Sequence, residues 1–86
     1  MTTFPFILQT PSGTVVSGDV TQLELRTYDG SLGVLAGHEP IVAACPAGIV
    51  RIQQDGAWVR FKTDPCILTM DGHTATILTS QAQYAG

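Results

Sequence analysis

The sequence predicts an all-β protein with the architecture of a small antiparallel β-sandwich or flattened barrel. Three observations support this prediction: apolar and polar residues alternate over short segments, turn signals recur at short intervals, and no segment keeps a helical period beyond a turn or two. Such alternation is typical of strands, and short strands at this turn spacing are typical of sandwiches and barrels. Because 86 residues make one small domain, we expect a single domain over residues 1–86.

The expected strands follow from the alternating segments. These segments are residues 4–8, 22–26, 57–62 and 74–77. In the first, Phe4, Phe6 and Leu8 share one face of a strand and point toward the expected core. The β-branched and aromatic residues in the other segments agree with strands, since these side chains pack well on a pleated surface.

Two tight turns predict two β-hairpins. In "IVRIQQDGAWVRFK", Asp55-Gly56 accepts the positive φ angles that a two-residue hairpin turn requires. The segment "CILTMDGHTATIL", with Asp71-Gly72 at its centre, predicts the second hairpin. The C-terminal "SQAQYAG" offers Ser80 as a helix N-cap, but a helix that begins there stops at once.

Composition and charge exclude several classes of protein. A hydrophobic fraction of 44% with 13% charged residues is unlike a disordered chain, and it leaves apolar surface for contacts. The four basic residues, scattered along the sequence, cannot neutralise a run of phosphates, so we expect no nucleic-acid partner. No apolar stretch approaches the ~20 residues of a membrane span, and no basic residue precedes the first apolar run, so neither membrane insertion nor a secretory signal is expected.

The reactive side chains form no recognisable catalytic or metal-binding pattern. The candidate nucleophiles and bases are Ser17, Ser31, Cys45, Cys66, His38 and His73. The sequence leaves their geometry open, but no helix start or basic cluster lies beside either cysteine to lower its pKa. The cysteines and histidines lack the close spacing of zinc ligands. In apolar surroundings, the two cysteines are predicted to be packed, reduced thiols rather than a disulfide.

The segment "YDGSLGVLAGHEP", residues 28–40, holds three glycines, a histidine and a glutamate, and this composition also occurs in phosphate-binding loops. A phosphate loop leads from a strand into a helix N-terminus. Here Pro40 and an apolar run without helical period follow. We therefore expect the glycines to turn a corner of the sheet. Because the carboxylates mostly fall in turns as well, no enzyme and no cofactor are predicted.

Four pieces in a fixed order resemble the N-terminal β-sandwich domain of the epsilon subunit of F-type ATP synthases. The pieces are Thr10–Gly13, Ser17–Val20, Asp29–Pro40 and Ile49–Ile52. The resemblance extends from about Phe4 to Thr79. It implies a central-stalk subunit that performs no chemistry, binds the gamma subunit sideways and rests one end on the polar loops of the c subunits of the membrane rotor ring.

The resemblance also implies two groups of contact residues. The corner that matches the ring-facing loop of the family comprises Asp29, Gly30, Ser31 and Leu32. The residues that match the gamma-facing region are His38, Ile41, Val42, Ala43 and Ala44. Family members often have an acidic residue where Ser31 stands, facing basic ring loops, so Asp29 has to supply the charge here.

Three departures from the family pattern carry expectations of their own. Pro46-Ala47-Gly48 has one residue more than the usual Pro-Gly, and residues 63–66 replace a Ser-Gly-Gly turn, so we expect that hairpin to be built differently. Family members continue beyond the position of Gly86 into a two-helix hairpin that regulates activity and in some members binds ATP. The resemblance thus implies a coupling subunit without nucleotide binding, peripheral to the cytoplasmic face of the inner (plasma) membrane.

Two other functions are weighed beside the rotor subunit. The first is a free-standing binding module that kept the sandwich and changed its partner, and it is motivated by Ala47 and by the altered turn at residues 63–66. The second is a small hydrolase that uses Cys45 or Cys66 as its nucleophile.

Overall fold

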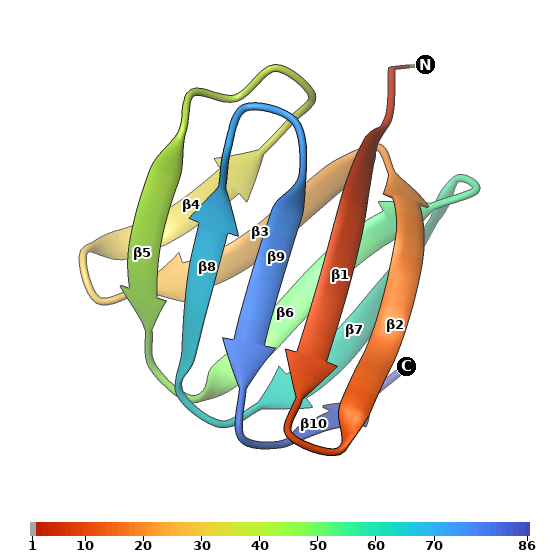
Figure 1. Ribbon diagram of the computed structural model, residues 1–86. Coiled ribbons are helices and arrows are strands. Elements are labelled where there is room, and N and C mark those ends of the chain that lie inside the picture. The colour runs from red at the N-terminus through yellow and green to blue at the C-terminus, as the bar shows by residue number, and fades with distance from the viewer. Residues whose placement is uncertain (1) are drawn as a thin grey trace.

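A computed structural model describes residues 2–86, and over this range every regular element is a β-strand. The strands are β1 (Phe4–Thr10), β2 (Gly13–Val20), β3 (Gln22–Thr27), β4 (Gly30–Val34), β5 (Ile41–Cys45), β6 (Gly48–Gln54), β7 (Ala57–Thr63), β8 (Cys66–Met70), β9 (Ala75–Thr79) and β10 (Ala82–Tyr84). They form two five-stranded sheets that face each other (Figure 1). The predicted β-sandwich is confirmed.

The two sheets differ in strand order. The β1 sheet has the order β2-β1-β9-β8-β5 and lies in front in Figure 1, while the β6 sheet has the order β10-β7-β6-β3-β4. Neighbouring strands are antiparallel except β1 and β9, which run parallel with Phe6 opposite Ala75. This one pairing departs from the predicted antiparallel arrangement. It joins segments nearly seventy residues apart, for which local alternation gives no signal.

The two predicted hairpins are confirmed. In the turn between β6 and β7, Asp55 and Gly56 have φ angles of 51° and 79°, as a type I′ turn requires. In the turn between β8 and β9, the Asp71 carboxylate accepts the backbone N–H groups of His73 at 2.8 Å and Thr74 at 2.7 Å. These two bonds lower the pKa of Asp71, because they favour its charged form.

The core lies between the sheets and is filled by the inward half of each alternating strand. Phe4, Phe6 and Leu8 are buried as predicted, and they meet residues from the opposite sheet. The largest fully buried side chains are Phe6, Leu8, Leu23, Ile52, Leu68, Met70, Ile77, Val20 and Val34. Each such side chain contributes roughly 1.5–3 kcal/mol by leaving water, which makes this layer the main source of stability.

The helix start that Ser80 offers in the sequence is not formed. Residues 82–84 form β10, which pairs with β7 through Ala82 opposite Thr63. The Ser80 hydroxyl caps no helix and donates to the Asp64 carboxylate at 2.7 Å. Residues 82–84 pair as a strand because β7 would otherwise present unpaired backbone groups at the edge of its sheet. The Tyr84 ring also packs edge-on against Phe61, which stabilises the pairing.

Residues 63–66 are expected above to form a hairpin of altered build, and this is also wrong. β7 and β8 belong to different sheets and do not pair, so Asp64 and Pro65 carry the chain across from one sheet to the other. The Thr79 hydroxyl donates to the carbonyl groups of Asp64 and Pro65 at 3.1 and 3.2 Å. The crossing is thereby tied to the end of β9.

Candidate functional site

The two predicted contact regions lie at opposite ends of β4 (Figure 1). The Asp29 corner forms the turn between β3 and β4, and His38 lies in the loop between β4 and β5. Since β4 spans five residues, the two regions stand at opposite ends of the sandwich, roughly 13 Å or more apart along the strand.

The β3–β4 turn holds the residues predicted to face the rotor ring. The Thr27 hydroxyl donates to the Gly30 carbonyl at 2.9 Å and accepts the Asp29 N–H at 3.1 Å, which fixes the tip of the turn. Asp29, Gly30 and Ser31 are exposed, whereas Leu32 is half-buried against the core and supports the turn from beneath.

Tyr28 belongs to the same exposed tip and is absent from the contact residues predicted above. Its side chain is 68% exposed beside Asp29. The sequence gives one signal for this exposure, which is that Tyr28 directly precedes the turn dipeptide Asp29-Gly30. An aromatic side chain at the tip of a turn cannot reach the core and stays exposed.

The loop after β4 is an architectural corner, as predicted. The His38 N–H donates to the Leu35 carbonyl at 3.1 Å, and Gly37 between them has a φ of 80°, which favours glycine. The His38 ring nitrogen Nδ1 lies 2.7 Å from the Glu39 carbonyl. Because a carbonyl only accepts, Nδ1 carries the hydrogen, and the ring is held half-buried in one orientation.

Strand alternation divides the predicted gamma-facing run of β5 into two pairs. Val42 and Ala44 point outward, and Val42 is 74% exposed, whereas Ile41 and Ala43 are half-buried against the core. The run is predicted above as one contact segment, but a strand offers only every second side chain to a partner.

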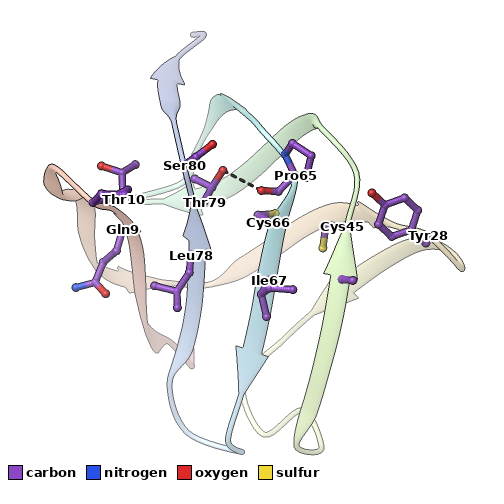
Figure 2. Close-up of a pocket in the computed structure, with 12 residues that line it drawn as sticks. Gln9, Thr10, Tyr28, Cys45, Pro65, Cys66, Ile67, Leu78, Thr79 and Ser80 are labelled. Carbon is purple, nitrogen blue, oxygen red and sulfur yellow. Dashed lines mark hydrogen bonds between the residues drawn. The ribbon is translucent and has the colours of Figure 1, made fainter.

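Val42 and Ala44 continue into a larger surface. Ala44 lies opposite Ile67 of β8, and Ile67 lies opposite Leu78 of β9. Ile67 and Leu78 are 43% and 50% exposed. We call these four residues, on the outside of the β1 sheet, the apolar face. At one end of it lies a groove of about 740 Å³ whose lining includes Ile67, Leu78 and Ala44 (Figure 2).

All four basic residues of the chain lie on the outside of the β6 sheet. They are Arg26 on β3, Arg51 on β6, and Arg60 and Lys62 on β7. Each alternates with buried neighbours in its strand, so each points outward. We call this surface the cationic face. These residues are scattered along the sequence, and the pairing of β3, β6 and β7 brings them to one surface.

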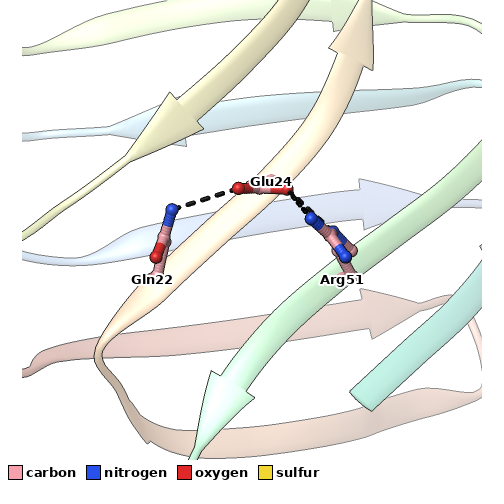
Figure 3. Close-up of polar contacts among 3 residues, drawn as sticks. All are labelled: Gln22, Glu24 and Arg51. Atoms are coloured by element: carbon pink, nitrogen blue, oxygen red, sulfur yellow. Dashed lines mark hydrogen bonds and ion pairs between the residues drawn. The ribbon is translucent and has the colours of Figure 1, made fainter. Parts of the chain in front are cut away.

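Among these four basic residues, Arg51 has the most closely defined side-chain contacts. Its Nε donates to the Glu24 carboxylate at 2.7 Å, and Gln22 donates to the other carboxylate oxygen at 3.1 Å (Figure 3). The guanidinium carbon lies 4.2 Å from the centre of the Trp58 ring, a cation–π contact. These partners offset the repulsion from Arg60, which lies directly opposite Arg51.

The two candidate cysteines lie away from both candidate histidine bases. Cys45 ends β5 and faces Cys66 at the start of β8, whereas His38 precedes β5 and His73 follows β8. Each thiol is thus separated from the histidines by the length of a five-residue strand, roughly 13 Å. Within residues 2–86 no group of three or more potential ligands is placed to hold a metal ion.

The thiols themselves have the environment of core residues. Both are free and buried, as predicted. Burial raises the pKa of the Cys45 thiol to about 12 and also raises that of Cys66. The thiols are therefore neutral at pH 7, which is the opposite of an activated nucleophile. The part of the chain that the structure describes also contains no helix long and apolar enough to cross a membrane.

Comparison with known proteins identifies the sandwich. Residues 3–85 match the family model described as the beta-sandwich domain of the ATP synthase delta/epsilon chain. The chain belongs to this family. The predicted resemblance is thereby confirmed, and the match reaches past Thr79 to include β10.

Individual relatives in the family are ATP synthase epsilon chains. The chain is 31% identical over 84 residues to the epsilon chain of Caldicellulosiruptor bescii, covering 98% of this chain and 61% of the relative. It is 32% identical over 78 residues to the chloroplastic epsilon chain of Huperzia lucidula, covering 91% and 56%. The chain thus spans about six-tenths of the length of these relatives.

Two solved assemblies contain the same fold. A chain of the Euglena gracilis mitochondrial ATP synthase, solved with OSCP, F1 and the c-ring, superposes with a TM-score of 0.89 at 22% identity, covering 95% of this chain and 53% of that one. A chain of the Tetrahymena thermophila mitochondrial ATP synthase, solved as central stalk and c-ring, superposes at 0.79 and 15% identity, covering 92% and 64%. At these identities the likeness shows the fold.

Proposed function

We propose that this chain is a central-stalk subunit of an F-type ATP synthase. In this role it binds the gamma subunit and the c subunits of the rotor ring, and it couples ion translocation to ATP synthesis without catalysing a reaction itself. The observation that carries the proposal is the family match over residues 3–85, together with relatives that are ATP synthase epsilon chains. Such a subunit is peripheral to the cytoplasmic face of the inner (plasma) membrane.

The proposed gamma contact consists of His38 and the outward residues of β5. Val42 and Ala44 offer apolar area that a partner can desolvate, and the fixed His38 ring lies at the start of the same segment. Ile41 and Ala43 take part indirectly, by holding β5 on the core. A contact of this kind is stabilised mainly by the burial of apolar area at its centre.

The proposed ring contact is the tip of the β3–β4 turn. Asp29 is exposed there, next to Ser31 and Tyr28, and its carboxylate is free to approach basic loops. Leu32 anchors this tip to the core. Because a two-sheet block resists shear between its layers, a load applied at one end is transmitted to the contact at the other end.

Binding to the cognate gamma subunit tests the proposal. The isolated chain is titrated with gamma, and Val42→Asp is compared with Val15→Asp, an identical change at an exposed valine on the opposite edge strand of the same sheet. We expect Val42→Asp to weaken gamma binding at least about tenfold, since it desolvates a carboxylate in the contact. We expect Val15→Asp to bind like the wild type.

Two results count against the proposal. No association with gamma at micromolar concentration favours the alternative of a binding module with another partner. Equal binding by the two valine variants rejects β5 as the contact and leaves the family membership untouched. Of the features that motivated the alternative, Ala47 is exposed in the β5–β6 loop, so the extra residue there alters no strand.

A further inference from the structure

The two cysteines of the chain lie directly opposite each other on neighbouring strands. Cys45 of β5 is the register partner of Cys66 of β8 (Figure 2). Both side chains point toward the core and are free thiols, 2% and 4% exposed. The sequence contains no third cysteine. The fold thus brings the thiols of positions 45 and 66 together, and the proposed central-stalk role gives this pair no function.

The backbone places the pair within reach of a disulfide. The Ala44 carbonyl accepts the Tyr28 N–H at 3.3 Å on the far side of β5, so alternation turns the backbone groups of Cys45 toward β8. Directly opposite residues of this kind have Cα atoms about 5.5 Å apart, inside the range of about 4.4–6.8 Å found for disulfides.

The same geometry makes the bond strained. Cβ atoms of opposite residues are about 4.5–5.5 Å apart in a sheet, whereas a relaxed disulfide brings them to about 3.8 Å. Closing the bond therefore pulls β5 and β8 together locally. Strained disulfides are more easily reduced than structural ones, so a bridge here is opened again by ordinary thiols.

We propose that Cys45 and Cys66 are a reversible redox pair, oxidised to a cross-strand disulfide by a small disulfide such as oxidised glutathione and reopened by the reduced thiol. β5 is an edge strand that pairs with β8, and local opening of such an edge admits the reagent to the two cysteines, which already belong to the lining of the groove in Figure 2. The disulfide, once formed, links this edge strand covalently to β8.

Core residues surround both sulfurs. Burial is the largest influence on both thiols, and it raises the pKa of each. The Cys45 thiol and the Thr63 hydroxyl act in the opposite direction on the pKa of Cys66. The Thr63 hydroxyl has no hydrogen-bond partner. Leu25, Val50 and the charged Arg26 also line the small cavity beside the pair. Attack by either thiol on a disulfide therefore requires the local opening of β5, which brings the sulfurs into contact with water.

The reaction balances in two exchange steps. One of the two cysteines loses its proton to solvent, and its thiolate attacks one sulfur of oxidised glutathione, forms a mixed disulfide and releases one glutathione thiolate. The other cysteine then loses its proton to solvent, attacks the protein sulfur of the mixed disulfide and releases the second glutathione. The two protein thiols lose two electrons and two protons, and one oxidised glutathione becomes two reduced ones.

The test equilibrates the folded wild-type chain in buffers of oxidised and reduced glutathione at several ratios, and then quenches with acid. We expect a monomer that is lighter by two hydrogens, with a peptide map that links Cys45 to Cys66. We expect the oxidised fraction to fall back when reduced glutathione is added, and the approach to equilibrium to quicken at least threefold per pH unit between pH 7 and 9, as the thiolate fraction grows. Cys45→Ser, as control, takes up one glutathione at most.

Several outcomes overturn the proposal. One is that both thiols stay free at every ratio of oxidised to reduced glutathione. Another is that only mixed disulfides with glutathione or disulfides between two chains form. A bridge that appears only in denaturant, or one that persists in excess reduced glutathione, also contradicts a reversible pair in the folded chain. The wild-type chain carries the decisive readout, so the result does not depend on whether a cysteine variant folds. It is also independent of gamma binding.

Discussion

The outer faces of the two sheets are built by the same alternation of side chains and carry opposite chemistry. The cationic face has every lysine and arginine of the chain, whereas the apolar face has none of them and presents Val42, Ile67 and Leu78 to solvent. With 13% charged residues, the chain has few charges to distribute. Because all the basic residues lie on one sheet, the outer surface of the other sheet costs little free energy to desolvate. The apolar face can therefore be buried by a partner, whereas the cationic face remains hydrated.

The sharpest test of this difference uses two isoleucines of nearly equal exposure, Ile67 at 43% on the apolar face and Ile49 at 44% on the cationic face. Ile67 lies opposite Ala44 and continues the apolar face beside the proposed gamma contact. We expect Ile67→Lys to weaken gamma binding by roughly 30-fold, about 2 kcal/mol, because a partner seated on Val42 and Ala44 also desolvates the ammonium group. Ile49→Lys is expected to bind normally. Isothermal titration calorimetry measures both, and urea unfolding checks that both variants fold. Equal losses would show that the two faces do not differ in binding.

The cationic face depends on Glu24, which offsets the charge of Arg51 beside Arg60. Glu24→Gln is expected to lower the free energy of unfolding by about 1 kcal/mol, a small value because the pair is partly exposed. Adding Arg60→Gln to this variant should recover part of the loss, since it removes the opposing cation. Urea unfolding at low and high salt measures both effects. A loss that is unchanged by the second substitution would contradict the repulsion between the two arginines.

A third region, the tip of the β3–β4 turn, lies outside both faces and contributes an acidic charge. We expect Asp29→Asn to weaken binding to reconstituted c-ring by a few-fold at low ionic strength, with the difference disappearing as salt screens it. Asp55→Asn, in an exposed turn at the other end of the sandwich, is the matched control. A difference that persists at high salt would argue for a contact other than an ionic one.

The smallest effect is expected in the β8–β9 turn, where Asp71 accepts two backbone N–H groups. Its pKa is lowered in the folded chain, so it contributes stability above its unfolded pKa and loses that contribution as pH falls through the folded value. Asp71→Asn should therefore be slightly less stable than wild type at pH 7 and equal to it in strong acid. Thermal melts across this range measure the change. A gap that widens toward acid would reverse the sign and reject the assignment.

Much of the fold followed from local pattern. The inward faces of the four alternating segments, both hairpins and the glycine corner at Gly37 could be predicted because they depend on neighbours in sequence. The parallel β1–β9 pairing and the strand at residues 82–84 could not, since both are decided by which backbone edge is left open after the other strands pair.

The candidate site was predictable only in part. The family motif located the β3–β4 turn and the loop at His38, but the alternation that divides Ile41–Ala44 was applied to the strands and not to the contact run. The grouping of the cations was beyond the sequence. Arg26, Arg51 and Arg60 come from three strands, and their common face exists only once β3, β6 and β7 are placed side by side.

The position of β1 has a consequence for synthesis of the protein. During synthesis β1 emerges before the other strands of the two sheets, yet it lies second in its sheet, and one of its two neighbours is β9, which ends at Thr79. The edge of β1 that faces β9 therefore stays unpaired until residues 75–79 are translated, and such long-range closure is slow. Until then the hairpin of β1 and β2 exposes Phe4, Phe6 and Leu8, a target for chaperones that shield nascent apolar strands.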